Sequence, residues 1–257
     1  MSRIFLFGDL HGNANSFKYR VKSYIDSLQQ DDIIICLGDV GLQYGNNYGY
    51  SLRKAMSKFP GTIYVMRGNH DCRYWREHVE LNQITTSAIE WPHEEWTIDS
   101  DLLYEKKYDN IKYIRDEGDI LHINGQNILF IPGAYSVDKE YRLNNNLPYE
   151  PHEQLTYMEQ LNLLAQIEQF VQNNKIDYVC SHTAPLSIQP YFKDLFLGFI
   201  DQFTVDKSME YFLDEVYNII GKDVKRWYFG HYHHDRNVST NFTMLYRKVV
   251  ELGEKIE

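Results

Sequence analysis

The sequence predicts an α/β fold in which buried strands alternate with amphipathic helices. Short apolar runs recur along the chain, and they are continuous and rich in β-branched or aromatic residues. Continuous apolar runs are typical of strands that are covered on both faces. Segments with helical periodicity separate several of these runs. At 257 residues, the chain is long enough to bury one large core with a modest insertion.

The N-terminal part of the chain is predicted to be β-α-β-α-β. Its strands are the apolar runs Ile4–Phe7, Ile33–Leu37 and Thr62–Met66. Between the first two runs, a helical pattern places five apolar side chains on one face: Phe17, Val21, Tyr24, Ile25 and Leu28. Such a face is expected to pack against the sheet.

The C-terminal part continues the alternation of strands and helices. The predicted strands are Ile128–Ile131, Tyr178–Cys180 and Trp227–Phe229. The first helical pattern between them has an apolar face formed by Tyr157, Leu161, Leu164, Ile167 and Val171. The second has one formed by Val205, Met209, Phe212, Leu213 and Val216. Both helices are expected to cover the sheet.

Two irregular segments are predicted to be insertions on a single domain of residues 1–257. One spans about 72–119 and is rich in aromatic, His and acidic residues; the other spans about 135–151 and contains three consecutive asparagines and two prolines. Neither has linker composition, and the chain has no internal repeat. Because each follows a polar motif, we expect them to form walls or a cap over a site. Ordinary surface loops are the alternative.

The composition excludes several classes of protein. The formal net charge is −10, from 26 basic and 36 acidic residues, and no basic block interrupts it. This balance argues against a large nucleic-acid interface. No stretch has the length of a membrane span, so no membrane partner is expected. The N-terminus lacks a signal pattern, and the three cysteines lack paired spacing. We therefore expect a cytoplasmic protein.

Five short polar clusters follow apolar runs and carry the chemistry of the sequence. They are Gly8-Asp9-Leu10-His11-Gly12, Gly38-Asp39-Val40-Gly41, Gly68-Asn69-His70-Asp71, Ser181-His182-Thr183-Ala184-Pro185 and Gly230-His231-Tyr232-His233. Residues just after the carboxyl ends of strands line the ligand crevice of open α/β sheets. The clusters supply carboxylate, carboxamide and imidazole donors for two divalent or trivalent metal ions. Two metals that clamp a phosphate can cleave a phosphoester.

In this order, the clusters resemble those of the calcineurin-like metallophosphoesterases, and the resemblance spans Phe7 to His233. Segments Gly133–Lys139 and Ser181–Gln189 also resemble a bacterial and phage branch of that family. The resemblance implies a sandwich of two β-sheets flanked by helices, with a cap of loops or insertions. It also implies a hydrolase that acts on phosphoester bonds and uses two metal ions, with Mn, Fe or Zn as the candidates.

The resemblance also implies a division of the metal ligands. One metal is expected to bind Asp9, His11 and His233, and the other Asn69, His182 and His231. Asp39 is expected to bridge the two metals, and a metal-bridging hydroxide to attack phosphorus. His70 is expected to protonate the leaving oxygen. Because His234 follows His233, a shift of the loop by one residue would exchange these two histidines.

The sequence departs from the family pattern after Asp39. Family members that act on phosphoserine or on dinucleoside tetraphosphates usually have Gly-Asp-x-x-Asp-Arg-Gly, whereas this chain has Leu42 and Gln43 at the Asp and Arg positions. This argues against protein phosphatase activity of that type. Asp71 or a backbone carbonyl is then the candidate to orient His70. Candidate phosphate contacts on nearby loops are Asn13, Tyr44, Arg73, Lys139 and Arg142.

The predicted function is therefore a metal-dependent phosphoesterase with a small phosphorylated substrate. A phosphomonoester, a phosphodiester such as a cyclic nucleotide, and a nucleotide polyphosphate all remain open, as does the oligomeric state. A nuclease of the same fold is one alternative, although the acidic composition argues against it. A metal-bound sensor or interaction module without turnover is the other. The complete ligand set and His70 argue against that module.

Overall fold

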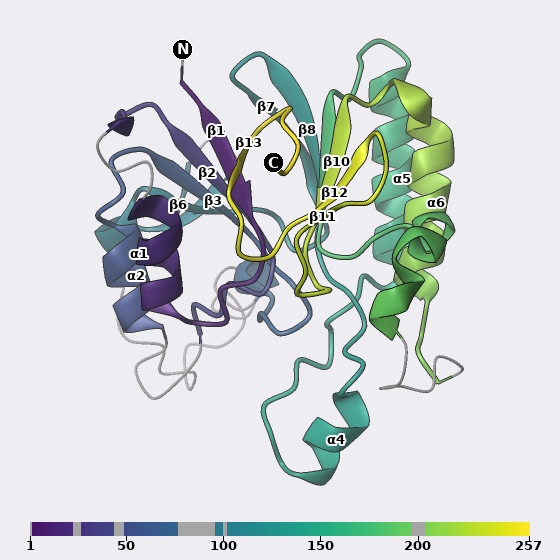
Figure 1. The fold of residues 1–257 in the computed structure, drawn as a ribbon, viewed down its shortest axis with the longest axis horizontal. Helices are drawn as coiled ribbons and strands as arrows, with labels where there is room; N and C mark the ends of the chain where they lie inside the picture. Colours follow the sequence, from purple (N-terminus) through teal and green to yellow (C-terminus); the bar gives the residue numbers. More distant parts are fainter. Residues whose placement is uncertain (1, 23–26, 44–48, 77–95, 100–101, 197–203) are drawn as a thin grey trace.

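Two β-sheets face each other at the centre of the fold, and helices cover their outer faces. The computed structural model describes residues 2–22, 27–43, 49–76, 96–99, 102–196 and 204–257. The main helices are α1 (Ala14–Lys22), α2 (Tyr50–Met56), α5 (Tyr157–Val171) and α6 (Ser208–Ile220). Helices α1 and α2 lie outside one sheet, and α5 and α6 lie outside the other (Figure 1). This arrangement confirms the predicted α/β fold with two sheets between helices.

Seven described strands form the first sheet, in the order β13-β1-β2-β3-β6-β5-β4. Their bounds are β1 (Ile4–Phe7), β2 (Ile33–Leu37), β3 (Thr62–Met66), β4 (Trp96–Asp99), β5 (Leu102–Glu105), β6 (Ile111–Tyr113) and β13 (Val250–Glu251). Strands β1, β2, β3 and β6 are parallel. Strands β4, β5 and β13 pair in antiparallel fashion. The first three strands have the bounds that the sequence predicts.

Six described strands form the second sheet, in the order β11-β12-β10-β9-β8-β7. Their bounds are β7 (Asp119–Ile123), β8 (Gln126–Ile131), β9 (Tyr178–Ser181), β10 (Arg226–Phe229), β11 (Arg236–Asn237) and β12 (Phe242–Met244). Strands β8, β9, β10 and β12 are parallel. Asn124 and Gly125, with φ of 49° and 76°, connect β7 to β8. An Asn-Gly pair with positive φ is typical of a tight hairpin turn.

The core explains why the strand sequences are apolar without interruption. On β1, Ile4 and Leu6 belong to the core between the two sheets, whereas Phe5 and Phe7 pack beneath α1 and α2. Successive side chains of a strand point to opposite faces, and here both faces are buried. On β9, Cys180 faces the core between the sheets and Val179 faces α5 and α6.

Helix boundaries differ from the periodicity at two places. The first predicted helix includes Leu28, but α1 ends at Lys22 and residues 23–26 lie outside the described part. The last predicted helix includes Val205, but α6 begins at Ser208, so Val205 precedes the observed helix. Helix α5 begins with a capping box in which the Thr156 hydroxyl accepts from Glu159 N–H. No helix in the described part is long and apolar enough to cross a membrane.

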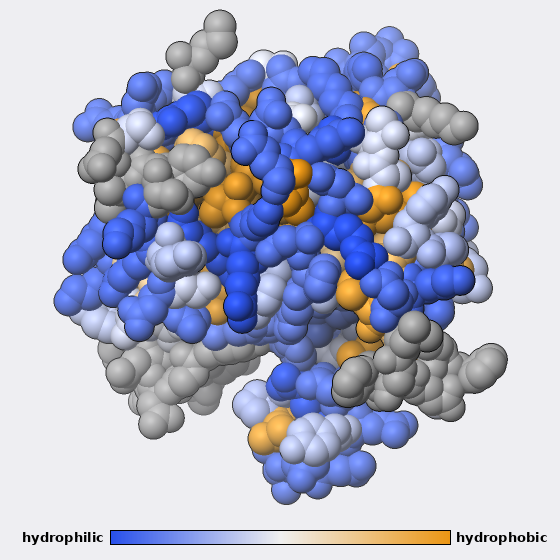
Figure 2. Space-filling view, in the orientation of Figure 1, coloured by the Kyte–Doolittle hydropathy of each residue, from blue (hydrophilic) through white to orange (hydrophobic). Residues whose placement is uncertain are grey.

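The two irregular segments take different forms. Residues 135–151 form an arm that contains α4 (Lys139–Asn144) and extends beyond the carboxyl ends of the central strands (Figure 1). On the face drawn in Figure 2, which is mostly hydrophilic, this arm stands apart from the body. In segment 72–119, the described residues include β4, β5 and β6 at the edge of the first sheet, while 77–95 and 100–101 lie outside the described part. Short 3₁₀ segments η3 (Lys106–Tyr108), η4 (Leu186–Phe196) and η5 (Gly221–Asp223) complete the fold.

Candidate metal centre

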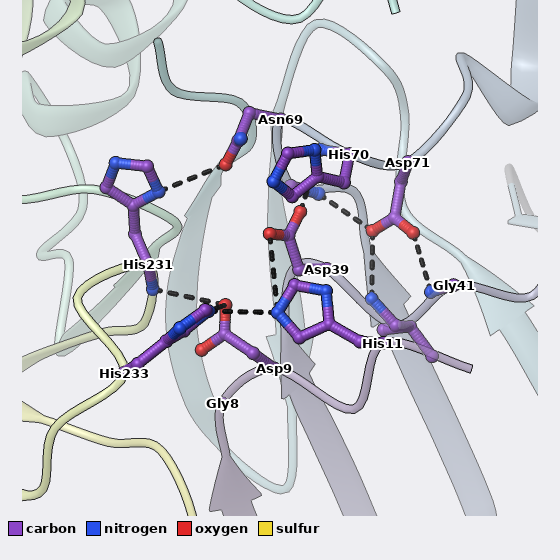
Figure 3. A network of polar contacts seen from close by, with 12 residues as sticks. Gly8, Asp9, His11, Asp39, Gly41, Asn69, His70, Asp71, His231 and His233 are labelled. Atoms are coloured by element: carbon purple, nitrogen blue, oxygen red, sulfur yellow. Dashed lines mark hydrogen bonds and ion pairs between the residues drawn. The ribbon is translucent and has the colours of Figure 1, made fainter. Parts of the chain in front are cut away.

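The five polar clusters meet where the carboxyl ends of the two sheets come together. Asp9, Asp39 and Asn69 follow β1, β2 and β3 of the first sheet. His182 and His231 follow β9 and β10 of the second sheet. Neighbouring strands of each set are parallel, so their ends deliver these side chains to one place (Figure 3). The gathering of the clusters at one edge follows the prediction from strand order.

One group of donors consists of Asp9, His11 and His233. The Nε2 atoms of His11 and His233 lie 2.9 Å apart, and His233 Nε2 lies 3.9 Å from Asp9 Oδ1. All three residues offer a ligand atom within 4.8 Å of the others. Asp9 is buried, and its Oδ2 atom has no hydrogen-bond partner among the residues that the structure describes. A buried carboxylate oxygen without a partner is costly unless a cation balances it.

A second group consists of Asn69, His182 and His231. Asn69 Oδ1 lies 2.9 Å from His182 Nε2 and 3.0 Å from His231 Nδ1. The amide nitrogen of Asn69 donates to Ser136 Oγ at 2.8 Å, which turns the amide oxygen toward the two rings. His182 Nδ1 lies 2.7 Å from the carbonyl oxygen of Leu37. Since a carbonyl only accepts, Nδ1 carries a proton and Nε2 faces the group.

Asp39 lies between the two groups. Its Oδ1 atom is 3.5 Å from His182 Nε2, and its Oδ2 atom is 4.0 Å from His11 Nε2. One oxygen therefore faces each group. The backbone N–H of His70 donates to Asp39 Oδ1 at 2.9 Å, which holds the carboxylate in this orientation (Figure 3). A carboxylate placed in this way offers one oxygen to each group of donors.

Burial and mutual charge set the protonation of the site. Burial raises the pKa of Asp9, although the charge of His182 opposes it. Burial would also raise the pKa of Asp39, but the nearby His182, His70 and His11 rings outweigh it and lower that pKa. Burial lowers the pKa of His231 to about 3. An ionised Asp39 and a neutral His231 are the forms that bind metal.

Backbone geometry at the site is unusual. His11, Asp39, His231 and His233 all have positive φ, with values of 46°, 48°, 68° and 50°. Non-glycine residues rarely adopt this region, and such strain clusters at functional sites. The backbone also comes close at Gly68, where a Cβ atom would lie 2.1 Å from Asp39 Oδ1. Only glycine fits at that position.

Asp71 organises the loops of the site. Its carboxylate accepts backbone N–H groups from Val40 at 3.0 Å, Gly41 at 2.8 Å and Gly68 at 2.9 Å. The sequence named Asp71 or a backbone carbonyl as the candidate to orient His70. In the structure, the Asp71 carboxylate accepts from these amides and from the Tyr74 hydroxyl at 3.3 Å. Asp71 therefore joins the loop after β2 to the loop after β3.

Arg20 holds the backbone that carries Asp9, one of the donors of the first group. Its guanidinium, buried beneath α1, donates to the carbonyl oxygens of Gly8 and Asp9, the latter at 2.8 Å. Neither Arg20 nor Ser136 was identified from the sequence. A basic residue between the apolar positions Phe17 and Val21 of the predicted first helix was the available signal for Arg20. For Ser136, its place within the Gly133–Lys139 segment was the signal.

Among the predicted substrate contacts, Asn13 and Arg73 have other partners. Asn13 Oδ1 accepts the N–H groups of Asn15 and Ser16 at 3.0 and 2.9 Å, so it caps the start of α1. The Arg73 guanidinium makes two hydrogen bonds with Glu159, at 2.5 and 2.9 Å, and bonds the carbonyl oxygens of His152 and Gln154. We therefore leave both residues out of the proposed substrate contacts.

Arg142 does reach the site. It lines one cavity together with His11 and His70. Its Nε atom donates to Asp138 at 2.7 Å and its Nη1 atom to the Pro148 carbonyl at 3.0 Å. Lys139 instead lies over the rings of Tyr135 and Tyr149, at 5.7 and 5.3 Å from their centroids. Tyr44, the remaining predicted contact, lies outside the described residues.

The sequence and the fold of this chain resemble those of known proteins. A family model described as calcineurin-like phosphoesterase matches residues 2–235. Among solved structures, 17 chains match. One of them has a TM-score of 0.50 and 13% sequence identity, covering 97% of this chain and 95% of its own chain. At this identity the likeness concerns the fold alone. A search of curated proteins returned no match.

Proposed function

Since this chain belongs to the calcineurin-like phosphoesterase family, we propose that it is a hydrolase that cleaves phosphoester bonds with two metal ions. One observation carries the proposal. The donor atoms divide into two groups, and Asp39 directs one carboxylate oxygen toward each. The donors themselves fit metal ions, because the set combines carboxylate, amide oxygen and imidazole.

In the proposed centre, each group binds one metal. One metal is held by Asp9, His11 and His233, and the other by Asn69, His182 and His231. Asp39 belongs to both. The unpartnered Asp9 Oδ2 atom and the close approach of two imidazole nitrogens support this assignment, because a cation would satisfy all of these atoms. Mn, Fe and Zn all suit such ligands.

The chemistry follows from the positions of the side chains. Two metal ions bound here would supply the positive charge that holds the phosphate and would lower the pKa of a water molecule for attack on phosphorus. Burial lowers the pKa of the His70 ring, so its protonated form is a stronger acid. A ring nitrogen of His70 would donate a proton to the leaving oxygen. Arg142 would contact the substrate from the cavity that it shares with His70.

The substrate is proposed to be a small phosphorylated molecule. The net charge of −10 argues against a large polyanionic partner. We also propose a cytoplasmic location, because Cys36 and Cys180 are buried free thiols.

The test is manganese-dependent hydrolysis of p-nitrophenyl phosphate and bis-p-nitrophenyl phosphate by the wild type and by Asp39→Asn. We expect hydrolysis of at least one ester by the wild type, and loss of hydrolysis together with lowered metal content in the variant. Asp31→Asn is the matched control, because Asp31 is exposed and precedes β2, whereas Asp39 follows the opposite end of that strand.

Two results would contradict the proposal. Hydrolysis that persists in excess chelator, or in Asp39→Asn, would exclude a catalytic role for the metals. Two bound metals without hydrolysis of either ester would favour a sensor or interaction module.

A further inference from the structure

Two cavities border the candidate metal centre, and His70 lines both of them. The first has a volume of about 310 Å³ and reaches Asp39, Asn69 and His231. The second has a volume of about 460 Å³ and reaches His11. Each volume falls within the range of about 300–1,000 Å³ that is typical of small-molecule sites.

The first cavity, here called the aromatic cavity, combines rings with a polar end. Phe196 and Tyr232 both line it, in an edge-to-face arrangement with centroids 5.9 Å apart. The Tyr232 hydroxyl lies 2.9 Å from Thr183 Oγ1 and accepts from Gln189 Nε2 at 3.4 Å. Glu210 also lines this cavity and is buried. Such a cavity suits a planar aromatic or heteroaromatic group whose edge carries polar atoms.

The second cavity, here called the polar cavity, has a different lining. Arg142 and Glu150 bring opposite charges, and Gln43 and Tyr149 add polar groups. The Arg142 side chain is held in place by Asp138 and by the Pro148 carbonyl. This lining accepts a polar group with hydroxyls or a second ring, because Cys72, Pro148 and the ring of Tyr149 line the cavity beside the charged groups.

The arm of residues 135–151 contributes to both cavities. Its first part, with Tyr135, Val137 and Asp138, lines the aromatic cavity. Its later part, with Arg142 and Tyr149, lines the polar cavity. A phosphorus atom held at the metal centre would therefore lie beside both cavities, because both reach proposed ligands and share His70 in their linings.

We infer from this pair of cavities that the substrate is a phosphodiester with one ester group in each cavity, the aromatic or heteroaromatic group occupying the aromatic cavity. A diester carries two groups on phosphorus, whereas a monoester carries one and would leave a cavity empty. Hydrolysis adds water across one P–O bond and yields a phosphomonoester and an alcohol. The inference rests on the proposed function, since it assumes that phosphorus is held at the two metals.

The experiment uses three phosphinates that cannot be hydrolysed and that carry the same single charge. Dimethylphosphinate, methylphenylphosphinate and diphenylphosphinate present zero, one and two rings, and their affinities for the manganese-loaded protein are measured by calorimetry. Because both cavities have room for a ring, we expect each ring to strengthen binding, with diphenylphosphinate at least tenfold tighter than methylphenylphosphinate. Equal affinity of the one-ring and two-ring compounds would overturn the inference.

A variant pair tests the assignment of the aromatic cavity. Phe196→Ala is expected to weaken the binding of diphenylphosphinate at least fivefold and to leave the affinity for dimethylphosphinate unchanged. Tyr191→Ala is the control, because Tyr191 lies in the same 3₁₀ segment and is 64% exposed. An unchanged affinity of Phe196→Ala for diphenylphosphinate would contradict the assignment.

Turnover separates this inference from the proposed function. Manganese-dependent hydrolysis with a higher kcat/KM for bis-p-nitrophenyl phosphate than for p-nitrophenyl phosphate supports both. A preference for the monoester, together with equal binding of the one-ring and two-ring phosphinates, overturns the diester inference and leaves the phosphoesterase intact. A protein that binds no manganese and hydrolyses neither ester overturns both.

Discussion

The Nε2 atoms of His11 and His233 lie 2.9 Å apart, although 222 positions separate the two residues in the chain. His11 follows β1 in the first sheet, and His233 follows β10 in the second. The pair therefore forms when the two sheets are packed together. Both residues have positive φ, so the backbone of each loop is also fixed in an unfavourable region to bring the rings into contact.

Replacement of His233 tests this pair directly. We expect His233→Ala to lose one of two bound manganese ions and most of the hydrolysis, because its ring is one of three donors in the first group. His234→Ala is the control, since the adjacent His234 is exposed. Metal content by atomic emission and kcat with bis-p-nitrophenyl phosphate are the measurements. If His234→Ala loses the metal instead, His234 rather than His233 is the metal ligand.

Replacement of His70 should affect catalysis and leave the metals in place. His70→Asn removes the proposed proton donor, and we expect kcat to fall by about 10²–10⁴-fold. The backbone N–H that bonds Asp39 is retained, so both metals should remain. A substrate with a very acidic leaving group needs little protonation and should lose less activity. An equal loss for good and poor leaving groups would contradict the acid role.

Arg20 should act on the site through the backbone. Arg20→Met leaves the carbonyl oxygens of Gly8 and Asp9 without their buried donor, and we expect a loss of about 1–3 kcal/mol in the free energy of unfolding. Manganese affinity should fall as well. Lys18→Met is the control on the same helix, because Lys18 is exposed. Urea denaturation and metal titration are the measurements, and unchanged affinity would limit Arg20 to a role in stability.

Gly68 tests how closely the backbone must approach Asp39. In Gly68→Ala, the new Cβ would lie 2.1 Å from Asp39 Oδ1, so the carboxylate has to move. We expect loss of bound metal, because Asp39 is the proposed ligand shared by both groups, and the measurement is the metal content. Gly125→Ala is the control: it meets nothing within 4 Å, and its positive φ should cost about 1 kcal/mol without loss of metal. Full metal content in Gly68→Ala would contradict the bridging position of Asp39.

Glu210 should make stability depend on pH. Burial raises its pKa from 4.5 to about 7, so the folded state holds a proton that the unfolded state releases. This contribution is fully present below pH 4.5 and is lost as the pH rises through 7. Glu210→Gln cannot ionise, so its stability relative to wild type should rise by about 3 kcal/mol between pH 4.5 and 8.

The measurement is the free energy of urea unfolding for metal-free protein at several pH values. Glu215→Gln is the control on the same helix, since Glu215 is exposed and should change stability by less than about 0.5 kcal/mol. A difference between Glu210→Gln and wild type that stays constant with pH would show that Glu210 ionises normally.

The central strands could be predicted because both of their faces are buried. Ile33–Leu37 is apolar throughout, so its sequence alone identifies a covered strand. Very short strands and edge strands give a weaker signal. Strand β13 is two residues long and β6 is three, and both are defined by pairing with β1 and β3 rather than by their own sequence. Strand β7 reads Asp-Ile-Leu-His-Ile and has one fully buried residue, Ile123.

The candidate ligands could be predicted because each stands in a short motif beside glycine at a strand end. Their supporting contacts could not be predicted, because they involve backbone atoms. Arg20 bonds two carbonyl oxygens, and Asp71 bonds three amides, so no pair of side chains in the sequence marks either role. The ion pair of Arg73 could not be predicted either, because its partner Glu159 lies 86 positions away, at the start of α5.

Because residues that follow strands of both sheets form the site, the order in which the chain is synthesised matters for metal binding. The proposed ligands begin at Asp9 and end at His233, and the ribosome adds them in that order. Until the segment after β10 has been synthesised, a nascent chain has an incomplete set of ligands and cannot hold both ions. Metal loading should therefore be one of the last events of maturation, and fragments truncated before His231 should emerge without a working centre however well their first sheet folds.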